Sequence, residues 1–186
     1  MESAGKKIKQ LREARNFSIE QLAERSKTDK KFIEELESDQ RVPSVAPLLK
    51  IARGLGVRLS TFLDDDPVSG AVVVRAGESQ TALEFSGLGP YCVSTLEFRP
   101  LARNKKDRRM EPFIIDVQPS VPEENTFSIH EGEEFIYVLQ GEIEVLYGDD
   151  RYVLGVGDSI YYDSPTPHQV QAAGDREAQI LAVIYS

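Results

Sequence analysis

Apolar residues in the first 63 positions recur every three or four residues, which is the spacing of helices that bury one face. In GKKIKQLREARNF, Ile8 and Leu11 share one face and charged residues cover the other. In KKFIEELES the predicted buried stripe consists of Phe32, Ile33 and Leu36. The pattern predicts five short helices that pack as one compact bundle.

Polar residues indicate where these helices begin and end. Ser18 followed by Gln21 is a capping-box pattern, which opens a second helix at SIEQLAERS. Asp29 can cap the third helix, and Asn16 suits the end of the first. The local chemistry therefore agrees with the periodicity.

A fourth helix, VAPLLKIARGL, is predicted behind Ser44 as its cap, with Pro47 still in the tolerated first turn. We expect Gly54 and Gly56 to end it. The next breaker-rich stretch, DDDPVSG at residues 64–70, is charged and predicts a linker.

Beyond residue 70 the pattern changes to alternating positions and short apolar runs, typical of strands. The runs are AVVVRA, YCVSTLEF, PFIIDV, EFIYVL, EIEVLYG, RYVLG, SIYYD, HQVQAA and QILAVIY. Short strands at regular spacing predict an antiparallel sandwich or barrel. The fold class is therefore α+β multidomain, with a helical bundle at 1–63, a linker at 64–70 and a β-barrel domain at 71–186.

Composition places the chain among ordinary globular proteins, with 40% hydrophobic and 28% charged residues. Cys92 is the only cysteine, which excludes an internal disulfide and a Cys-rich zinc module. The N-terminus lacks the apolar core of a signal peptide, and no apolar run approaches the ~20 residues of a membrane span. We expect a soluble, cytoplasmic protein with no membrane partner.

The net charge of -9 divides unequally along the chain. Residues 1–63 hold 13 Lys+Arg against 9 Asp+Glu, a net charge of +4, and the remainder holds 9 against 22, a net charge of -13. The first half can approach a polyanion, while the second half would be repelled by it.

Residues 5–63 resemble the Xre/Cro/C1-type helix-turn-helix family through IKQLREARNFSIEQLAERS, TDKKFIEELES and RVPSVAPLLKIARGLGVRLSTFL. The resemblance implies binding of double-stranded DNA, with the third helix in the major groove. It places Ser18 and Gln21 at the DNA backbone and Lys30, Lys31 and Glu34 on the groove side. It adds phosphate contacts from Lys27 and Arg41.

Acidic residues in and after the recognition helix depart from the usual family pattern; they are Glu34, Glu35, Glu37 and Asp39. A glutamate can accept a hydrogen bond from cytosine N4, but acids beside phosphates are unfavourable. The alternative is a helix-turn-helix fold that serves as a scaffold or dimerisation module.

Residues 72–185 resemble the cupin family, a double-stranded β-helix, through SIHEGEEFIYVLQGE and GDSIYYDSPTPHQV. Family barrels carry H-x-H, a downstream Glu and a later His as metal ligands, and this chain has Ser128, His130, Glu134 and His168 at those places. The resemblance thus implies a ligand set of two imidazoles and one carboxylate, which suits Fe(II) or Zn(II).

The spacing of His130 and Glu134 sets a geometric condition. In one straight strand they would lie roughly 13 Å apart, too far to share an ion. The chain must therefore fold back between them, which Gly132 allows. The alternative is an empty cavity in which His130 and His168 donate hydrogen bonds.

Two further groups of residues carry less specific signals. Tyr91, Ser128, Tyr137 and Tyr162 are assigned to an effector pocket, although aromatic residues in strands usually belong to the core. The segment RPLARNKKDRRM, residues 99–110, is strongly basic within an acidic half. It either captures an anion, touches DNA or a partner subunit, or forms a solvated hairpin loop.

Together these features predict a transcriptional regulator. The helical half would bind operator DNA as a homodimer or higher oligomer, and the barrel would bind a small-molecule effector. The alternative is a mononuclear non-haem iron enzyme similar to 2-hydroxypropylphosphonic acid epoxidase, which MEPFIIDV and TPHQVQAA resemble. That resemblance places Asn16 and Val93 where the epoxidase has an active-site lysine and tyrosine, so no catalytic residue is assigned.

Overall fold

The computed structural model describes residues 3–41, 43, 45–64, 68–76, 83–85, 96–119 and 127–185. The chain divides into two compact units. The first unit comprises Met1–Val72 and Arg103–Arg108, and the second comprises Val73–Ala102 and Arg109–Ser186. In the described ranges, no helix has the length and apolarity that crossing a bilayer requires.

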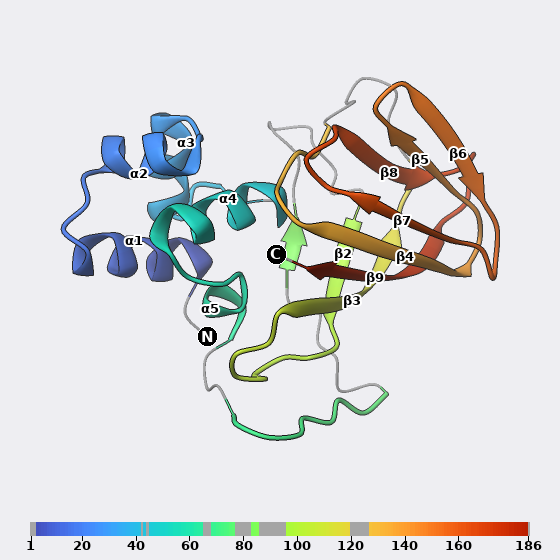
Figure 1. Ribbon diagram of the computed structural model, residues 1–186, viewed down its shortest axis with the longest axis horizontal. Helices are drawn as coiled ribbons and strands as arrows, with labels where there is room; N and C mark the ends of the chain where they lie inside the picture. The colour runs from blue at the N-terminus through green and yellow to red at the C-terminus, as the bar shows by residue number, and fades with distance from the viewer. Residues whose placement is uncertain are drawn as a thin grey trace. The chain divides into compact units, whose positions relative to one another are not determined.

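The described part of the first unit contains the five predicted helices (Figure 1). They are α1 (Ala4–Ala14), α2 (Ile19–Ser26), α3 (Lys30–Glu37), α4 (Val45–Leu55) and α5 (Ser60–Leu63). The Ser18 hydroxyl accepts from the Gln21 amide, and the Gln21 side chain accepts from the Ser18 amide at 2.8 Å. Asp29 accepts from the Phe32 amide at 3.2 Å. Both predicted caps are therefore confirmed, whereas Ser44 lies outside the described residues.

Two expectations about the helices are wrong. Phe32 is only half-buried, because its ring lies under the Arg41 guanidinium at 4.6 Å and not in the core. Gly54 does not end α4 but lies inside it, where a Cβ would come within 3.0 Å of Ser26. Gly54 therefore allows the close approach of α2 and α4, and Gly56, with φ +66°, follows the helix end.

A buried ion pair joins α1 to α3. Arg12 donates from Nε and Nη2 to the two carboxylate oxygens of Glu37 at 2.6 and 2.7 Å, and from Nη1 to the Phe17 carbonyl at 2.9 Å. The hydrogen bond with Glu37 raises the pKa of Arg12. With side chains only 11% and 6% exposed, this fork-to-fork pair is part of the packed interior.

The segment Arg103–Arg108, which connects two strands of the second unit, packs within the first unit. Arg108 forms an ion pair with Asp64, whose Oδ1 also accepts from the Asn104 amide at 2.9 Å. Val68 donates to the Asn104 carbonyl and accepts from the Lys106 amide. The side chain of Asp64 is therefore buried, unlike that of an exposed linker residue, and the Arg108 guanidinium is bound to this carboxylate and is not free to capture an anion.

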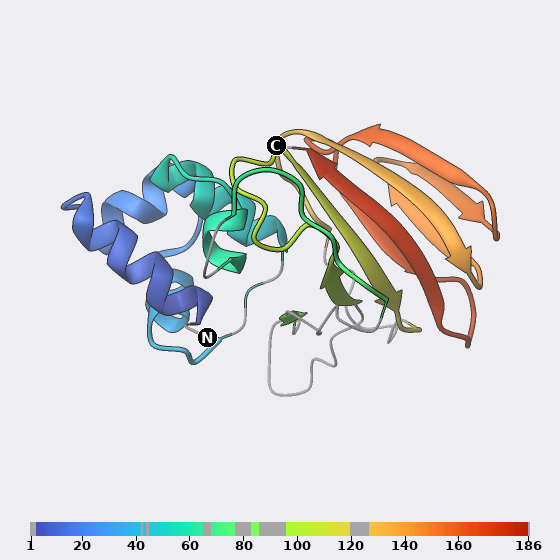
Figure 2. The ribbon, with the colours of Figure 1, turned by 90° about the horizontal axis from the view of Figure 1, so that it is seen from below.

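Within the described residues, the second unit consists of two antiparallel sheets (Figures 1 and 2). The strand order is β1-β2-β3-β9-β4-β7 in the larger sheet and β6-β5-β8 in the smaller one. The strands are β1 (Leu83–Phe85), β2 (Leu96–Pro100), β3 (Met110–Val117), β4 (Glu133–Gln140), β5 (Ile143–Tyr147), β6 (Asp150–Leu154), β7 (Ser159–Asp163), β8 (His168–Ala172) and β9 (Ala178–Tyr185).

The core of the second unit follows from the alternation of side chains along these strands. Buried inward residues include Phe113, Ile136, Val145 and Ile180. The predicted strand AVVVRA at 71–76 is wrong: these residues form no ladder, because an apolar alternation makes a strand only where a partner lies beside it. β1 was not predicted, and residues 91–95 of YCVSTLEF lie outside the described residues.

Candidate functional site

A tight turn brings His130 and Glu134 together at the start of β4. Gly132 has φ +99°, a conformation that side-chain-bearing residues rarely adopt, so the chain reverses there as the spacing required. The turn is fixed to the end of β7: His130 N–H donates to the Ser164 carbonyl at 3.2 Å, and Ser164 N–H donates to the Gly132 carbonyl at 3.0 Å.

His168, the first residue of β8, is fixed beside the same turn by a short antiparallel bridge. Ser128 N–H donates to the His168 carbonyl at 2.7 Å, and His168 N–H donates to the Ser128 carbonyl at 3.0 Å. The two cupin motifs, far apart in the sequence, therefore meet at this bridge.

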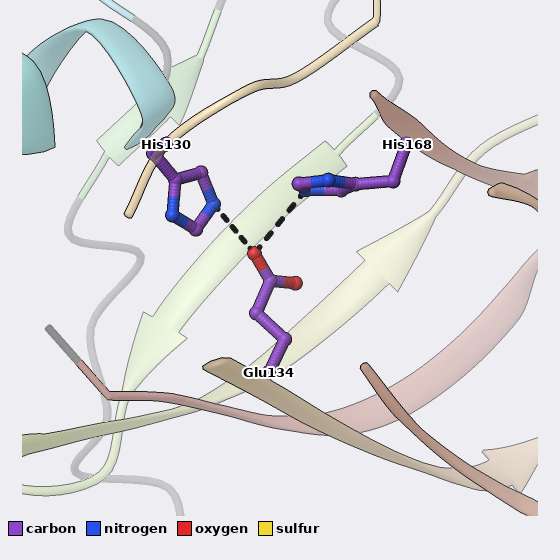
Figure 3. Close-up of side chains that lie close together, drawn as sticks. All are labelled: His130, Glu134 and His168. Carbon is purple, nitrogen blue, oxygen red and sulfur yellow. Dashed lines mark ion pairs between the residues drawn. The ribbon is translucent and has the colours of Figure 1, made fainter. Parts of the chain in front are cut away.

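The three predicted ligands converge inside the β unit (Figure 3). Glu134 Oε1 lies 2.6 Å from His130 Nε2 and 3.4 Å from His168 Nε2. One ligand atom from each residue lies within 4.8 Å of the others, and all three residues are buried. The arrangement is a compact cluster of two imidazoles and one carboxylate.

The outer nitrogen of each imidazole faces a backbone carbonyl. His130 Nδ1 lies 3.1 Å from the Glu131 oxygen, and His168 Nδ1 lies 2.8 Å from the Thr166 oxygen. When Nδ1–H donates to such a carbonyl, the neutral imidazole presents the lone pair of Nε2 inward. Both rings therefore turn Nε2 toward the centre of the cluster, as a metal ligand needs, and the donor set fits a divalent cation.

The charges within the cluster stabilise one another. Burial alone would raise the pKa of Glu134, but hydrogen bonds from His130 and His168 lower that pKa to about 2. Burial would lower the pKa of His168, but its hydrogen bond with Glu134 raises that pKa. The carboxylate is therefore ionised and is balanced by positive charge on its other side, which a proton or a metal cation can supply.

Tyr162 holds the second oxygen of the carboxylate. Its hydroxyl donates to Glu134 Oε2 at 2.7 Å, and its ring centroid lies 5.0 Å from that of His168. Burial and the neighbouring Glu134 charge raise the pKa of Tyr162, so the phenol keeps its proton and remains a donor. Tyr162 thus turns Glu134 Oε1 toward the two imidazoles.

Replacing Tyr162 by phenylalanine is expected to weaken metal binding by roughly 10- to 100-fold, because it removes a hydrogen bond that orients a ligand. Competition with a chelator of known affinity measures the change. Tyr152→Phe is the matched control, since Tyr152 is 41% exposed and its hydroxyl lies 3.5 Å from Asp150, outside the cluster. An unchanged affinity in Tyr162→Phe would contradict this positioning role.

The other residues assigned to an effector pocket are placed differently. Tyr137 lies on the face of β4 opposite to Glu134 and is 38% exposed, so it does not share a pocket with the cluster of His130, Glu134 and His168. The alternation of side chains along a strand puts residues three positions apart on opposite faces. Ser128 adjoins the cluster through its bridge to His168, and Tyr91 lies outside the described residues.

The residues predicted to meet DNA lie on and around α2 and α3. Ser18 and Gln21 form the N-terminal cap of α2, and the exposed Lys27 follows α2 with φ +51°. Lys30 contacts Glu20 at 2.5 Å and Glu34 at 3.6 Å. The hydrogen bond from Lys30 lowers the pKa of Glu20 to about 2, and the same contact raises the pKa of Lys30.

Two further cations of this surface share one acid. Lys31 lies 3.8 Å and Arg41 lies 3.0 Å from Glu35, while Lys31 remains 81% exposed. The i,i+4 spacing of Lys31 and Glu35 is visible in the sequence, but the pairing of Lys30 with Glu20 joins two helices and is not visible there. The sequence therefore identified the cations but missed Glu20 as a partner.

Comparisons with known proteins agree with this architecture. A helix-turn-helix domain model matches residues 5–65, and a cupin domain model matches residues 113–184. The HTH-type transcriptional regulator SutR of Escherichia coli K12 is 25% identical over 178 residues, covering 96% of this chain and 92% of that protein.

A second relative matches only half its length. The (S)-2-hydroxypropylphosphonic acid epoxidase of Streptomyces wedmorensis is 35% identical over 89 residues, and the match covers 45% of each protein. The sequence match thus covers less than half of that enzyme. Among solved structures, an HTH_3 family transcriptional regulator from Vibrio cholerae shares the fold with a TM-score of 0.70, at 21% identity, over 98% of this chain and 94% of that one. The two matched domain models and their order show that a helix-turn-helix domain precedes a cupin domain in this chain.

Proposed function

We propose that this protein is a DNA-binding transcriptional regulator whose cupin domain senses a small molecule at a bound divalent metal. The observation that carries the proposal is the buried cluster of His130, Glu134 and His168 in a chain that matches a transcriptional regulator over nearly its full length. Sensing and DNA binding are then assigned to different domains of one chain.

The DNA-binding surface is assigned to the start of α2 and to α3, as in other helix-turn-helix domains. The exposed ammonium groups of Lys27 and Lys31 supply phosphate contacts. Glu20, Glu34 and Glu35 lie beside the lysines of this surface and reduce its non-specific attraction to DNA phosphates. Recognition of the operator would therefore depend more on contacts with the bases. Glu34, 46% exposed in its side chain, can accept from cytosine N4.

The metal is assigned to Fe(II) or Zn(II), which accept two imidazoles and one carboxylate. Ser128 occupies the place of a fourth protein ligand in related barrels, so coordination positions remain for the effector. A bound metal would supply a Lewis acid that recognises an oxygen or nitrogen donor of the effector. His130 and His168 would orient it, and burial would exclude bulk water.

Regulation requires that the effector bind one conformation of the protein more tightly than the other, because equal affinity shifts no equilibrium. The net charge of -13 in the second half keeps the barrel away from the DNA duplex. The effector would therefore act through protein conformation and not by competing for phosphates.

Binding to a fluorescent fragment of the protein's own promoter tests the proposal. The affinity should fall steeply with salt, and Lys31→Ala should reduce the slope of log K against log salt by about 0.9, the contribution of one phosphate contact. Arg176→Ala, which removes an exposed cation from the cupin domain, should leave the slope unchanged. Absence of promoter binding at low salt would contradict the regulatory function.

The similarity to the epoxidase favours one alternative, a mononuclear iron enzyme of the cupin class. Such a protein would consume oxygen in the presence of a substrate and would not bind its promoter. Promoter binding and oxygen consumption, measured on the same iron-loaded preparation, therefore separate the two functions.

A further inference from the structure

The larger sheet of the second unit is apolar on both faces at its centre. Along β4 the inward residues include Ile136 and Val138, while Phe135, Tyr137 and Leu139 point outward. An antiparallel sheet that exposes one face to water normally alternates apolar with polar residues. This sheet has the pattern of a sheet that is covered on both sides.

The register of four neighbouring strands aligns outward side chains into two adjacent rows. Figure 2 shows β3, β9 and β4 side by side. The first row contains Pro112, Val183, Phe135 and Tyr161. The second row contains Ile114, Leu181 and Tyr137. These seven residues, called the apolar band below, carry no charge.

Polar groups flank the apolar band at both ends. Glu133 and Asp163 lie across from each other at one end, and Tyr161 donates a hydrogen bond to Glu133. At the other end Asp116 pairs with Arg99 at 2.6 Å and accepts from Gln179 at 2.7 Å. An aromatic, uncharged centre with a polar rim is the composition of protein–protein interfaces.

Two residues of the apolar band are exposed and the other five are half-buried. Tyr161 is 61% exposed and Tyr137 is 38% exposed. The four strands that carry the apolar band, about 4.8 Å each, and the eight residues of β9, at about 3.3 Å each, span roughly 500 Å² in projection. Protruding side chains increase the accessible area toward the ~800 Å² that each partner buries in a standard interface.

We propose that the apolar band is the homodimer interface, covered by the same face of a second copy of this chain. The second half carries a net charge of -13, so two copies repel unless their contact surface is uncharged at its centre, as the apolar band is. Two sheets can pack face to face through such surfaces about 10 Å apart. The choice of a second copy rests also on the proposed DNA-binding function, because helix-turn-helix domains read paired half-sites as dimers.

Sedimentation equilibrium of the full chain over a concentration series tests the proposal. The wild type should be dimeric, and Tyr137→Glu should raise the dimer dissociation constant about thirtyfold or more, as expected for a central interface residue. Tyr161→Lys should act similarly without placing a second acid beside Glu133. Val153→Glu is the matched control: Val153 is 52% exposed on β6 of the smaller sheet, and its substitution should leave the dimer intact.

Circular dichroism and thermal unfolding identify any variant that fails to fold, and Tyr161→Phe should retain the dimer because it keeps the ring. A monomeric wild type overturns the proposal, as does a dimer that survives both Tyr137→Glu and Tyr161→Lys. A dimer that dissociates in Val153→Glu places the interface on the smaller sheet and overturns it also. Binding to a DNA fragment with a single half-site is the separate measure of DNA binding: it should persist in folded monomeric variants, and its absence in the wild type would count against the proposed function instead.

Discussion

His130→Ala is expected to abolish the binding of a divalent metal at the proposed site. In the proposed site three protein side chains would hold the ion, and the substitution removes one of them, so the affinity should fall well beyond the ~10- to 100-fold cost of disturbing a supporting hydrogen bond. Metal content per chain, measured by elemental analysis after growth with added iron or zinc, should fall from near-stoichiometric to background.

Gln169→Ala is the matched control for this loss. Gln169 follows His168 in β8 and points to the opposite face of the strand, so metal content should not change. Chelation should lower the thermal stability of the wild type and of Gln169→Ala but not of His130→Ala, since only a protein that binds the ion is stabilised by it. Equal metal content in His130→Ala and wild type would contradict the assigned site.

Arg12→Ala is expected to destabilise the helical unit by about 3 to 5 kcal/mol, the cost of leaving one partner of a buried ion pair without the other. Glu37, whose side chain is only 6% exposed, would remain as an uncompensated buried charge. The Phe17 carbonyl would also lose a donor. The α1 and α3 helices would separate at lower denaturant concentration.

The sequence supplies two independent probes for this measurement. All seven tyrosines follow residue 90 and there is no tryptophan, so tyrosine fluorescence reports on the second unit alone. Far-UV circular dichroism is dominated by the helices of the first unit. In Arg12→Ala the circular dichroism transition in urea should shift more than the fluorescence transition.

Arg15→Ala provides the comparison within the same segment. Its guanidinium donates to the Leu11 carbonyl at 3.2 Å, near the end of α1, and such a contact contributes about 1 kcal/mol or less. If Arg12→Ala and Arg15→Ala shifted the helical transition equally, the Arg12–Glu37 pair would not be a major stabilising contact.

Local chemistry was sufficient to predict the helices. Ser18 with Gln21 and Asp29 cap helices through groups three residues away, and such contacts are visible in the sequence. Gly54 was misread because its role depends on Ser26, which lies on another helix. Helix boundaries were therefore predictable where contacts between residues close in the sequence determine them. They were not predictable where a contact with another helix determines them.

The candidate site was predictable for a different reason. His130, Glu134 and His168 were located through two sequence motifs and the requirement for a turn at Gly132. Tyr137 was misplaced although it lies three residues after Glu134 in one strand, so the alternation of side chains would have predicted its opposite direction. Tyr162 was assigned to a pocket, but its contact with Glu134 Oε2 required the pairing of β4 with β7.

The docking of Arg103–Arg108 within the helical unit limits how this gene can recombine. An exchange of one half for another at residues 64–70 would separate Asp64 from Arg108 and from the Asn104 amide, because those groups are encoded some forty codons downstream. A chimera that keeps the helices stable would have to inherit the β2–β3 connection with them. Each unit is thus encoded by two separate stretches of the gene. An exchange of one unit would therefore need crossovers on both sides of the β2–β3 connection as well as at the linker.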